Sequence, residues 1–178
     1  CDNLYAEYAD SKPHTSLLFG VTGSGKTSVF MKLIERVMND NKGIIVMVSE
    51  ISLTPQFVST FSKRFGEQIA VFHSALSLGE RLDEYKRVKK GLAKIVIGTR
   101  SAVFAPFEKV GLIIMDEEQE YSYKSESSPR YHAREIAKFR CSYDNALLVL
   151  SSATPSVESY YYAKNGRYSL NTLTERDG

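Results

Sequence analysis

Apolar runs of strand length recur along the chain, separated by more polar segments. The runs are rich in Ile, Val and Leu and contain few polar positions, which is typical of strands buried on both faces of a parallel sheet. They occupy residues 15–19, 43–48, 68–72, 94–98, 111–115 and 146–150. We therefore expect each of these runs to form a buried strand.

The segments between the runs carry apolar residues at helical spacing. Residues three or four positions apart lie on one face of a helix. Such triplets are Val29, Leu33 and Val37; Phe57, Phe61 and Phe65; and Leu82, Tyr85 and Val88. Strands that alternate with helices predict an α/β fold in three layers, with a parallel sheet covered by helices on both faces.

Composition fits one globular domain, because the 178 residues are 43% hydrophobic and 25% charged. The first dozen residues are polar and the last eight, NTLTERDG, form no clear closing element. We expect residues 1–14 to be the remnant of an upstream element and residues 15–178 to be the domain. The chain is thus predicted to be a fragment of a larger protein.

Charge and cysteine content say little about the binding partners and the cellular location of the protein. The formal charge of +2 permits an acidic partner such as nucleic acid without pointing to one. Cys1, Cys141 and three scattered histidines have no metal-ligand spacing, so no zinc site is expected here. With no export signal and no apolar run of membrane-spanning length, the chain is expected to be cytoplasmic, without membrane contact.

The first strand leads into a glycine-rich loop, GVTGSGKT, that matches G-x-x-x-x-G-K-[ST] and opens a helical segment. In this pattern the backbone N–H groups surround a polyphosphate, the lysine reaches the outer phosphates and the final hydroxyl binds Mg²⁺. The sequence therefore predicts an ATP site with Mg²⁺. Its residues are Gly20, Val21, Thr22, Gly23, Ser24, Gly25, Lys26 and Thr27.

Four carboxylates in five residues follow the run at 111–115, where mutual repulsion is unfavourable unless a cation is present. A metal held between Thr27 and a nucleotide needs a carboxylate on a neighbouring strand, and Asp116 is placed to supply it. Glu117 would then orient the attacking water and accept its proton. The catalytic set is predicted as Lys26, Asp116 and Glu117, whereas Glu118 and Glu120 could equally be a solvated turn.

Several stretches together resemble one family. The P-loop, DEEQ and SSAT resemble the first, RecA-like motor lobe of superfamily 2 helicases. SEISLTPQF, HSALSLGER, GTRSAVFAPF and the PRYHAR segment resemble the primosomal protein N′ (PriA) family of replication-restart helicases, from about Leu17 to Ser159.

The resemblance implies an ATP-dependent 3′→5′ DNA helicase that acts on stalled forks and in primosome assembly. It further implies several partners: single-stranded and branched DNA, a second motor lobe of the same protein, and primosome and helicase-loading proteins. The implied location is the bacterial cytoplasm. The family's zinc-binding cysteines are expected outside this chain. A single lobe is not expected to unwind DNA by itself.

The resemblance also assigns site residues by motif. Residues of SEISLTPQ and GTRS are expected to grip the DNA backbone, and an aromatic-rich loop is expected to meet unpaired bases. Ser152, Ala153 and Thr154 are expected, with Gln119, to couple ATP hydrolysis to DNA binding. A serine and a threonine at this place also suit a helix N-cap. The DNA contacts are Glu50, Thr54, Gln56, Thr99, Arg100, Ser101, Tyr121, Tyr123, Lys124, Arg130, Tyr131, His132 and Arg134.

Three positions depart from the family pattern. Ser49 replaces a usual proline, Ser151 a usual glycine, and Gln119 a usual histidine. Gln119 can form hydrogen bonds but carries no charge, so its part in coupling is open.

Two alternatives to a helicase lobe remain open, and one cluster of basic residues has no assigned function. ALSLGE faintly resembles the signature of transporter ATPases, another P-loop class. The chain could also be a nucleotide-dependent DNA-binding module without catalysis. Four cations on one predicted helix, Lys86, Arg87, Lys89 and Lys90, are interpreted as a solvated face.

Overall fold

The computed structural model of the chain describes residues 1–21 and 23–174. Within these residues, seven parallel strands form one sheet in the order β3-β4-β2-β5-β8-β1-β9. The strands are β1 (His14–Gly20), β2 (Gly43–Met47), β3 (Ile69–Phe72), β4 (Ile95–Gly98), β5 (Val110–Met115), β8 (Leu147–Ser152) and β9 (Ser169–Leu173). All the strands predicted from apolar runs are confirmed. β9 was not predicted.

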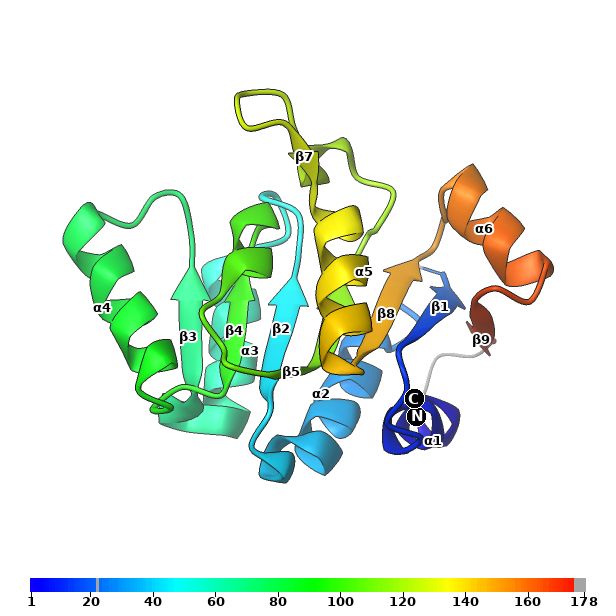
Figure 1. The fold of residues 1–178 in the computed structure, drawn as a ribbon, viewed down its shortest axis with the longest axis horizontal. Helices are drawn as coiled ribbons and strands as arrows, with labels where there is room; N and C mark the ends of the chain where they lie inside the picture. The colour runs from blue at the N-terminus through cyan, green and yellow to red at the C-terminus, as the bar shows by residue number, and fades with distance from the viewer. Residues whose placement is uncertain (22, 175–178) are drawn as a thin grey trace.

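Helices cover both faces of the sheet, as Figure 1 shows. α4 and α5 lie in front of the sheet in that view, and α2 and α3 lie behind it. The helices are α1 (Asp2–Ala9), α2 (Lys26–Val37), α3 (Pro55–Phe65), α4 (Leu78–Lys89), α5 (Ala133–Asp144) and α6 (Val157–Lys164). The predicted three-layer α/β fold, a RecA-like lobe, is therefore confirmed.

The alternation of side chains along each strand divides the core into two halves. In β5, Leu112 and Ile114 pack on the side of α1, α2 and α3, whereas Ile113 and Met115 pack on the side of α4, α5 and α6. Side chains of a strand point to opposite faces in turn, so a run that is apolar throughout must be covered on both. This burial on both faces is what made the strands visible in the sequence.

Helix α1 packs within the lobe. Leu4 and Tyr8 are buried against the core on the side of α2 and α3. The Tyr8 hydroxyl donates a hydrogen bond to Asp40 at 2.8 Å. The segment before the first strand is thus part of the same hydrophobic core.

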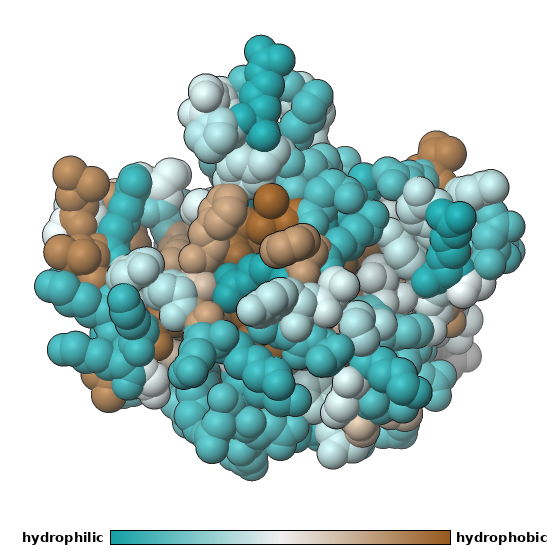
Figure 2. Space-filling model, viewed as in Figure 1, coloured by the Kyte–Doolittle hydropathy of each residue, from teal (hydrophilic) through white to brown (hydrophobic). Residues whose placement is uncertain are grey.

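Helix α4 forms where the apolar spacing predicted it, but most of its apolar side chains face outward. Val88 is buried, whereas Leu78, Leu82 and Tyr85 are exposed. Figure 2 shows hydrophobic side chains gathered at the left of the view, over α4. The helix lies at the edge of the sheet, beside β3, where there is too little sheet to cover its whole apolar face.

A short antiparallel hairpin projects beyond the carboxyl edge of the sheet (Figure 1). It pairs β6 (Lys124–Ser125) with β7 (Tyr131–His132) and follows the 3-10 turn η4 (Tyr121–Tyr123). The hairpin belongs to the aromatic-rich segment and was not predicted as β-structure, because two-residue strands leave no periodic pattern.

Candidate nucleotide and nucleic-acid site

The three predicted motifs meet at the carboxyl ends of three adjacent strands, β5, β8 and β1. Ligands of open parallel sheets bind at this edge. A cavity of about 490 Å³ lies there. Its lining comprises Gly23, Gly25, Lys26, Thr27, Asp116, Glu117, Gln119, Ala153 and Thr154. Residues that are up to 131 positions apart in the sequence (from Gly23 to Thr154) thus line one cavity.

The glycine-rich loop takes the backbone conformation that its glycines permit. Gly23 and Gly25 have φ values of 80° and 82°, in the left-handed region that other residues rarely adopt. Gly25 is the N-cap of α2, so the first N–H groups of that helix face the cavity edge, where an anion is favoured. Thr22, also predicted to bind ATP, lies outside the described residues.

Lys26 is held at the cavity by the loop itself. Its Nζ donates hydrogen bonds to the carbonyl oxygens of Gly20 at 2.8 Å and Val21 at 3.2 Å. The ammonium group is therefore kept at the phosphate-binding loop and takes no part in the apolar core. A phosphate could compete for it without the fold losing a buried contact.

Asp116, at the end of β5, is held by hydrogen bonds to residues of the two neighbouring strands, β2 and β8. Its N–H donates to the carbonyl oxygen of Met47 at 2.9 Å, and the Ser151 hydroxyl donates to its Oδ1 at 3.0 Å. Burial raises the pKa of Asp116, against the hydrogen bonds from Ser151 and the Glu117 N–H, which favour the carboxylate. The carboxylate thus has a fixed orientation at the nucleotide cavity and is largely shielded from solvent, which suits a ligand for a cation.

Glu117 turns away from its neighbours because its backbone is left-handed, with φ of 49°. Its Oε2 accepts hydrogen bonds from the Ser52 hydroxyl at 3.0 Å and the Ser49 hydroxyl at 3.2 Å. Ser49 and Ser151, which depart from the family pattern, therefore each bind one of the two predicted catalytic carboxylates. No pattern in the sequence indicated these contacts or a role for Ser52.

Glu118 has a structural role that matches neither alternative left open for it, because it is not in a solvated turn and does not line the nucleotide cavity. It is 1% exposed, and its Oε2 lies 3.1 Å from Arg134 Nη1. Its carboxylate also accepts from the Ser156 N–H at 2.6 Å and from the hydroxyls of Ser156 and Ser159 at 3.2 and 3.1 Å. Arg134 bonds Glu158 as well, at 2.8 Å. These contacts tie the loop after β5 to α5 and to the start of α6.

Gln119 reaches the neighbouring motif. Its Oε1 accepts from the Ser152 hydroxyl at 2.6 Å, and that hydroxyl accepts from the Thr154 N–H at 2.8 Å. The N-cap of α6 is Ser156, not Ser152 or Thr154. The cap explanation for the SSAT serine and threonine is therefore wrong, and Ser152 instead links the segments after β5 and β8.

The residues predicted to grip DNA divide between two cavities. Thr54 and Gln56 lie with Thr27 and Asp116 around a cavity of about 390 Å³ beside the nucleotide loop. Thr54 is also the N-cap of α3, accepting from the Phe57 N–H at 3.1 Å. The other four, Glu50, Thr99, Arg100 and Ser101, line a separate cavity of about 360 Å³ at the ends of β3 and β4.

The aromatic-rich segment is part core and part surface. Tyr123 has 0% of its surface exposed, and its hydroxyl donates to the Asp116 carbonyl oxygen at 2.5 Å. Neither Tyr123 nor the ion-paired Arg134 is available to nucleic acid in this structure, which corrects their predicted DNA contact. Tyr131 packs edge-on against Phe104. Exposed positions are Tyr121, Lys124 and Arg130.

Two side chains fix the base of this segment, Arg100 from the GTRS stretch and His132 from the segment itself. Arg100 Nη1 donates to the carbonyl oxygens of Lys124 at 3.0 Å and Ser122 at 3.3 Å, which joins the GTRS stretch to the hairpin. His132 caps α5 by accepting the Arg134 N–H at Nδ1, 3.1 Å away. Burial lowers the pKa of His132, and the charge of Arg134 adds to this.

Two further sequence features have a structural explanation. In ALSLGE, Ser77 and Glu80 form a capping box at the start of α4. This structural role explains the stretch, and no transporter signature is needed. Of the four cations at the end of α4, Lys86, Lys89 and the C-cap residue Lys90 are exposed. Arg87 instead donates to the carbonyl oxygens of Ile69 at 3.1 Å and Glu67 at 2.5 Å.

A metal at the nucleotide site would have few protein ligands. Over the described residues, no three His, Cys, Asp or Glu side chains lie together as a metal site. Mg²⁺ is usually bound through one or two side chains together with substrate phosphates. Thr27 and Asp116, which line the same cavity, fit that arrangement.

The profile of the DEAD/DEAH box helicase family matches residues 8–161. The chain therefore belongs to the DEAD/DEAH box helicase family. It is similar to the replication restart protein PriA of Bacillus subtilis, with 52% identity over 171 residues, 96% of this chain and 21% of that protein. PriA of Treponema pallidum is 50% identical over 157 residues, 88% of this chain and 24% of that protein. The resemblance to the PriA family is thereby confirmed.

The chain spans about a fifth to a quarter of the length of these curated relatives. Solved structures with the same fold include the Hef helicase domain of Pyrococcus furiosus, with a TM-score of 0.65 and 20% identity, covering 99% of this chain and 38% of that one. RecG bound to a three-way DNA junction gives a TM-score of 0.65 and 23% identity, over 99% of this chain and 24% of that one. Among the described residues, no helix combines the length and apolarity needed to cross a membrane.

Proposed function

We propose that this chain is the ATP-binding first motor lobe of an ATP-dependent 3′→5′ DNA helicase that acts in primosome assembly and in the restart of stalled replication forks. The observation that carries the proposal is the cavity in which Lys26, Thr27, Asp116 and Glu117 meet. The similarity to PriA proteins, which are named for replication restart, supports the biological role.

Each side chain at the cavity has a defined task in the proposal. Lys26 and the loop N–H groups bind the β- and γ-phosphates. Thr27 and Asp116 hold Mg²⁺, which offsets phosphate charge when it is bound. Glu117 orients the attacking water and accepts its proton. Its Oε2 accepts from Ser49 and Ser52, so Oε1 is the oxygen that we assign to the water.

Coupling between nucleotide and DNA is assigned to the segments that follow β2, β5 and β8. The Gln119–Ser152 hydrogen bond joins two of them, and the bonds from Ser49 and Ser52 to Glu117 join the third. On the proposal, single-stranded and branched DNA is held by residues of this edge. The exposed ones are Glu50, Thr54, Gln56, Ser101, Tyr121, Lys124 and Arg130. Arg100, Tyr131 and His132 are partly buried, and Thr99 is buried at the wall of the cavity of about 360 Å³.

The remaining machinery is assigned to parts of the protein beyond this lobe. We infer that residues 15–178 are the lobe of a larger bacterial cytoplasmic protein. Residues 1–14, in which α1 packs on the core of the lobe, are assigned to an upstream element. A second motor lobe, which supplies an arginine to the transition state, the zinc-binding cysteines, and the contacts to primosome and helicase-loading proteins lie outside it. The lobe alone is proposed to bind nucleotide without unwinding DNA, so that in isolation it is a nucleotide-dependent DNA-binding module.

Nucleotide binding by the purified chain tests the proposal. Lys26→Ala is expected to abolish binding of Mg²⁺-ATP and Mg²⁺-ADP, measured by calorimetric titration, while the unfolding temperature stays unchanged. Lys32→Ala, at an exposed position of the same helix, is the matched control and should bind as the wild type does. Unchanged affinity in Lys26→Ala would overturn the proposed site.

A further inference from the structure

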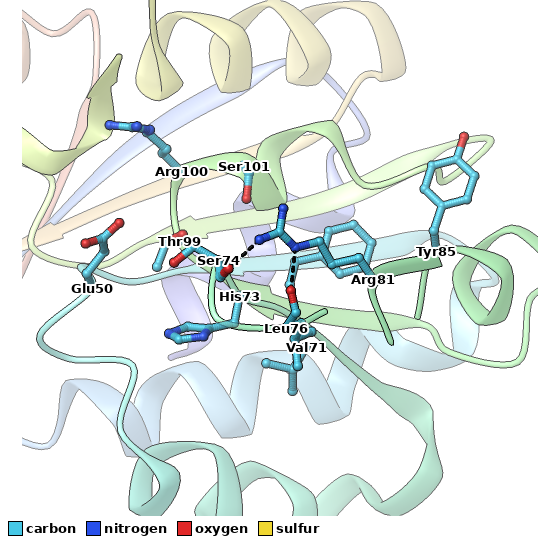
Figure 3. Close-up of a pocket in the computed structure, with 11 residues that line it drawn as sticks. Glu50, Val71, His73, Ser74, Leu76, Arg81, Tyr85, Thr99, Arg100 and Ser101 are labelled. Carbon is cyan, nitrogen blue, oxygen red and sulfur yellow. Dashed lines mark hydrogen bonds between the residues drawn. The ribbon is translucent and has the colours of Figure 1, made fainter. Parts of the chain in front are cut away.

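A second cavity, of about 360 Å³, lies at the carboxyl ends of β3 and β4 and is closed on one side by α4 (Figure 3). Among the residues that the structure describes, it shares no lining residue with the nucleotide cavity. Its apolar lining is Val71, Phe72, Leu76 and Tyr85, and its polar lining is Glu50, His73, Ser74, Arg81, Thr99, Arg100 and Ser101. It is therefore a distinct site with both apolar and polar walls.

The turn that forms one wall is held by hydrogen bonds. Arg81 Nε donates to the carbonyl oxygen of Leu76 at 2.9 Å, and Arg81 Nη2 donates to that of Ser74, as Figure 3 shows. The capping box of Ser77 and Glu80 fixes the same turn to the start of α4. The wall is thus ordered before any ligand arrives, which lowers the entropy that binding would cost.

The wall formed by α4 is fastened to β3 in a similar way. Glu84 Oε2 accepts from the Val71 N–H at 2.7 Å, and Arg87 Nη1 donates to the Ile69 carbonyl oxygen at 3.1 Å. Beneath them, β3 and β4 approach so closely that a Cβ at Gly98 would lie 2.4 Å from the Phe72 carbonyl oxygen. The base of the cavity is therefore set by the sheet itself.

The side chains of the cavity suit a flat heteroaromatic ring that is attached to an anion. Phe72 is partly exposed and Tyr85 is 42% exposed, so both rings have accessible apolar surface. His73 adds a group that can form hydrogen bonds with ring edges. Arg81 and Arg100 outnumber the one acidic lining residue, Glu50, which favours an anionic ligand.

We propose that this cavity binds one unstacked nucleobase of a single DNA strand, with its phosphate against Thr99, Arg100 and Ser101. The inference rests on the proposed function, because these three residues are among those assigned to the DNA backbone. Every base has a flat apolar face, so a pocket with aromatic walls can accept any base, as a motor that moves along a strand requires. The volume falls within the range of small-molecule sites.

Base-dependent binding provides the test. The purified chain is titrated with a fluorescent 15-nucleotide oligothymidylate and with the same backbone carrying abasic sites at every internal position. Wild-type chain should bind the base-bearing strand at least about fivefold more tightly, the lower end of what one stacked base contributes. Tyr85→Leu and Phe72→Leu should each remove most of this difference and leave abasic binding unchanged.

Two controls make the result specific. Tyr143→Leu replaces an 81% exposed tyrosine in the last turn of α5, away from the cavity, and should keep the full difference. A strand with one 5-iododeoxyuridine, irradiated in the complex, should crosslink to the cavity lining. Thermal unfolding checks that each variant folds.

The outcomes separate the two proposals. Equal binding of base-bearing and abasic strands, or wall variants that keep the difference, would overturn the base pocket while leaving DNA binding in place. If neither strand binds although Mg²⁺-ATP does, the DNA-binding part of the proposed function and the base pocket both fail. Crosslinks confined to the β6–β7 hairpin would place the base elsewhere and overturn the pocket.

Discussion

Arg134 Nη1 lies 3.1 Å from Glu118 Oε2 in the interior of the lobe, where the two side chains are 10% and 0% exposed. Burial alone would lower the pKa of Arg134, but the carboxylates of Glu158 and Glu118 outweigh it and raise that pKa. Arg134 therefore stays charged, and its contacts with Glu118 and Glu158 join the loop that carries Asp116 and Glu117 to α5 and α6.

Removing one partner of this pair should be costly. Arg134→Met leaves a buried carboxylate without its cation, and we expect the free energy of unfolding to fall by about 3–5 kcal/mol. Denaturant titration would measure it. Arg64→Met is the control, since it removes an exposed pair with Glu35 and should lower the unfolding free energy far less. A loss below about 1 kcal/mol in Arg134→Met would show that the pair does not hold these elements together.

Tyr123→Phe tests the structural role of that tyrosine. The substitution deletes only the hydroxyl that donates to the Asp116 carbonyl oxygen, so we expect a loss of about 1–3 kcal/mol in unfolding free energy. Affinity for single-stranded DNA should not change. Tyr121→Phe, at a 66% exposed position, should leave the unfolding free energy close to that of the wild type. Reduced DNA affinity with unchanged stability would restore Tyr123 as a DNA contact.

A pair of glycine substitutions tests the contact between β3 and β4. Gly98→Ala places a Cβ against the backbone of Phe72, and we expect it to lower the unfolding free energy by about 1–3 kcal/mol. Gly79→Ala, in the first turn of α4 with open space around it, should raise stability by about 0.4–1 kcal/mol. Similar effects from both would argue against a close approach at Gly98.

The neighbouring glutamates should respond in opposite ways. In the full-length protein, Glu117→Gln is expected to keep ATP binding and thermal stability while it slows hydrolysis at least about a hundredfold, as loss of a general base implies. Glu118→Gln should mainly lower the unfolding temperature and slow hydrolysis far less. Phosphate release and differential scanning fluorimetry measure the two effects. Equal slowing by both would refute the separation of their roles.

His132 gives the lobe a dependence on acid. Its folded-state pKa is lowered by burial and by Arg134, against Glu135, Glu118 and Glu158, so the folded state binds its proton less readily than the unfolded state does. Stability should therefore be intact above the unfolded pKa of about 6.5 and decrease as the pH falls below it. Protonation of Nδ1 would also remove the acceptor for the Arg134 N–H.

His132→Asn keeps a side-chain oxygen at this cap and cannot titrate. Its unfolding free energy should decline less than that of the wild type between pH 7.5 and pH 5. Parallel pH profiles for the two proteins would exclude His132 as the cause.

The strands and the nucleotide loop could be predicted because their signals are local. A run buried on both faces must be apolar at every position, and a phosphate loop needs its glycines at fixed spacing. β9 gave no such signal, because it is an edge strand in which polar residues such as Ser169 and Asn171 alternate with apolar ones. The outward apolar face of α4 could not be foreseen, since it depends on where the sheet ends.

The roles within the carboxylate cluster could not be separated in the sequence. Glu117 and Glu118 are adjacent, and only the left-handed backbone at Glu117 sends one to the Ser49–Ser52 loop and the other into the core. The same limit applies to Arg134, which looks like a DNA contact in sequence. Its partner Glu118 is 16 residues away, and only the packing of α5 brings them together.

Edge strand β3 is closed to further pairing by the helix that flanks it. The Val71 N–H is already bonded to Glu84, and the Ile69 carbonyl oxygen to Arg87. A strand from another molecule that approached this edge would have to displace those bonds before it formed its own, so the edge is a poor template for sheet extension between molecules. The two side chains that order the cavity wall thus also disfavour edge-to-edge aggregation of the lobe.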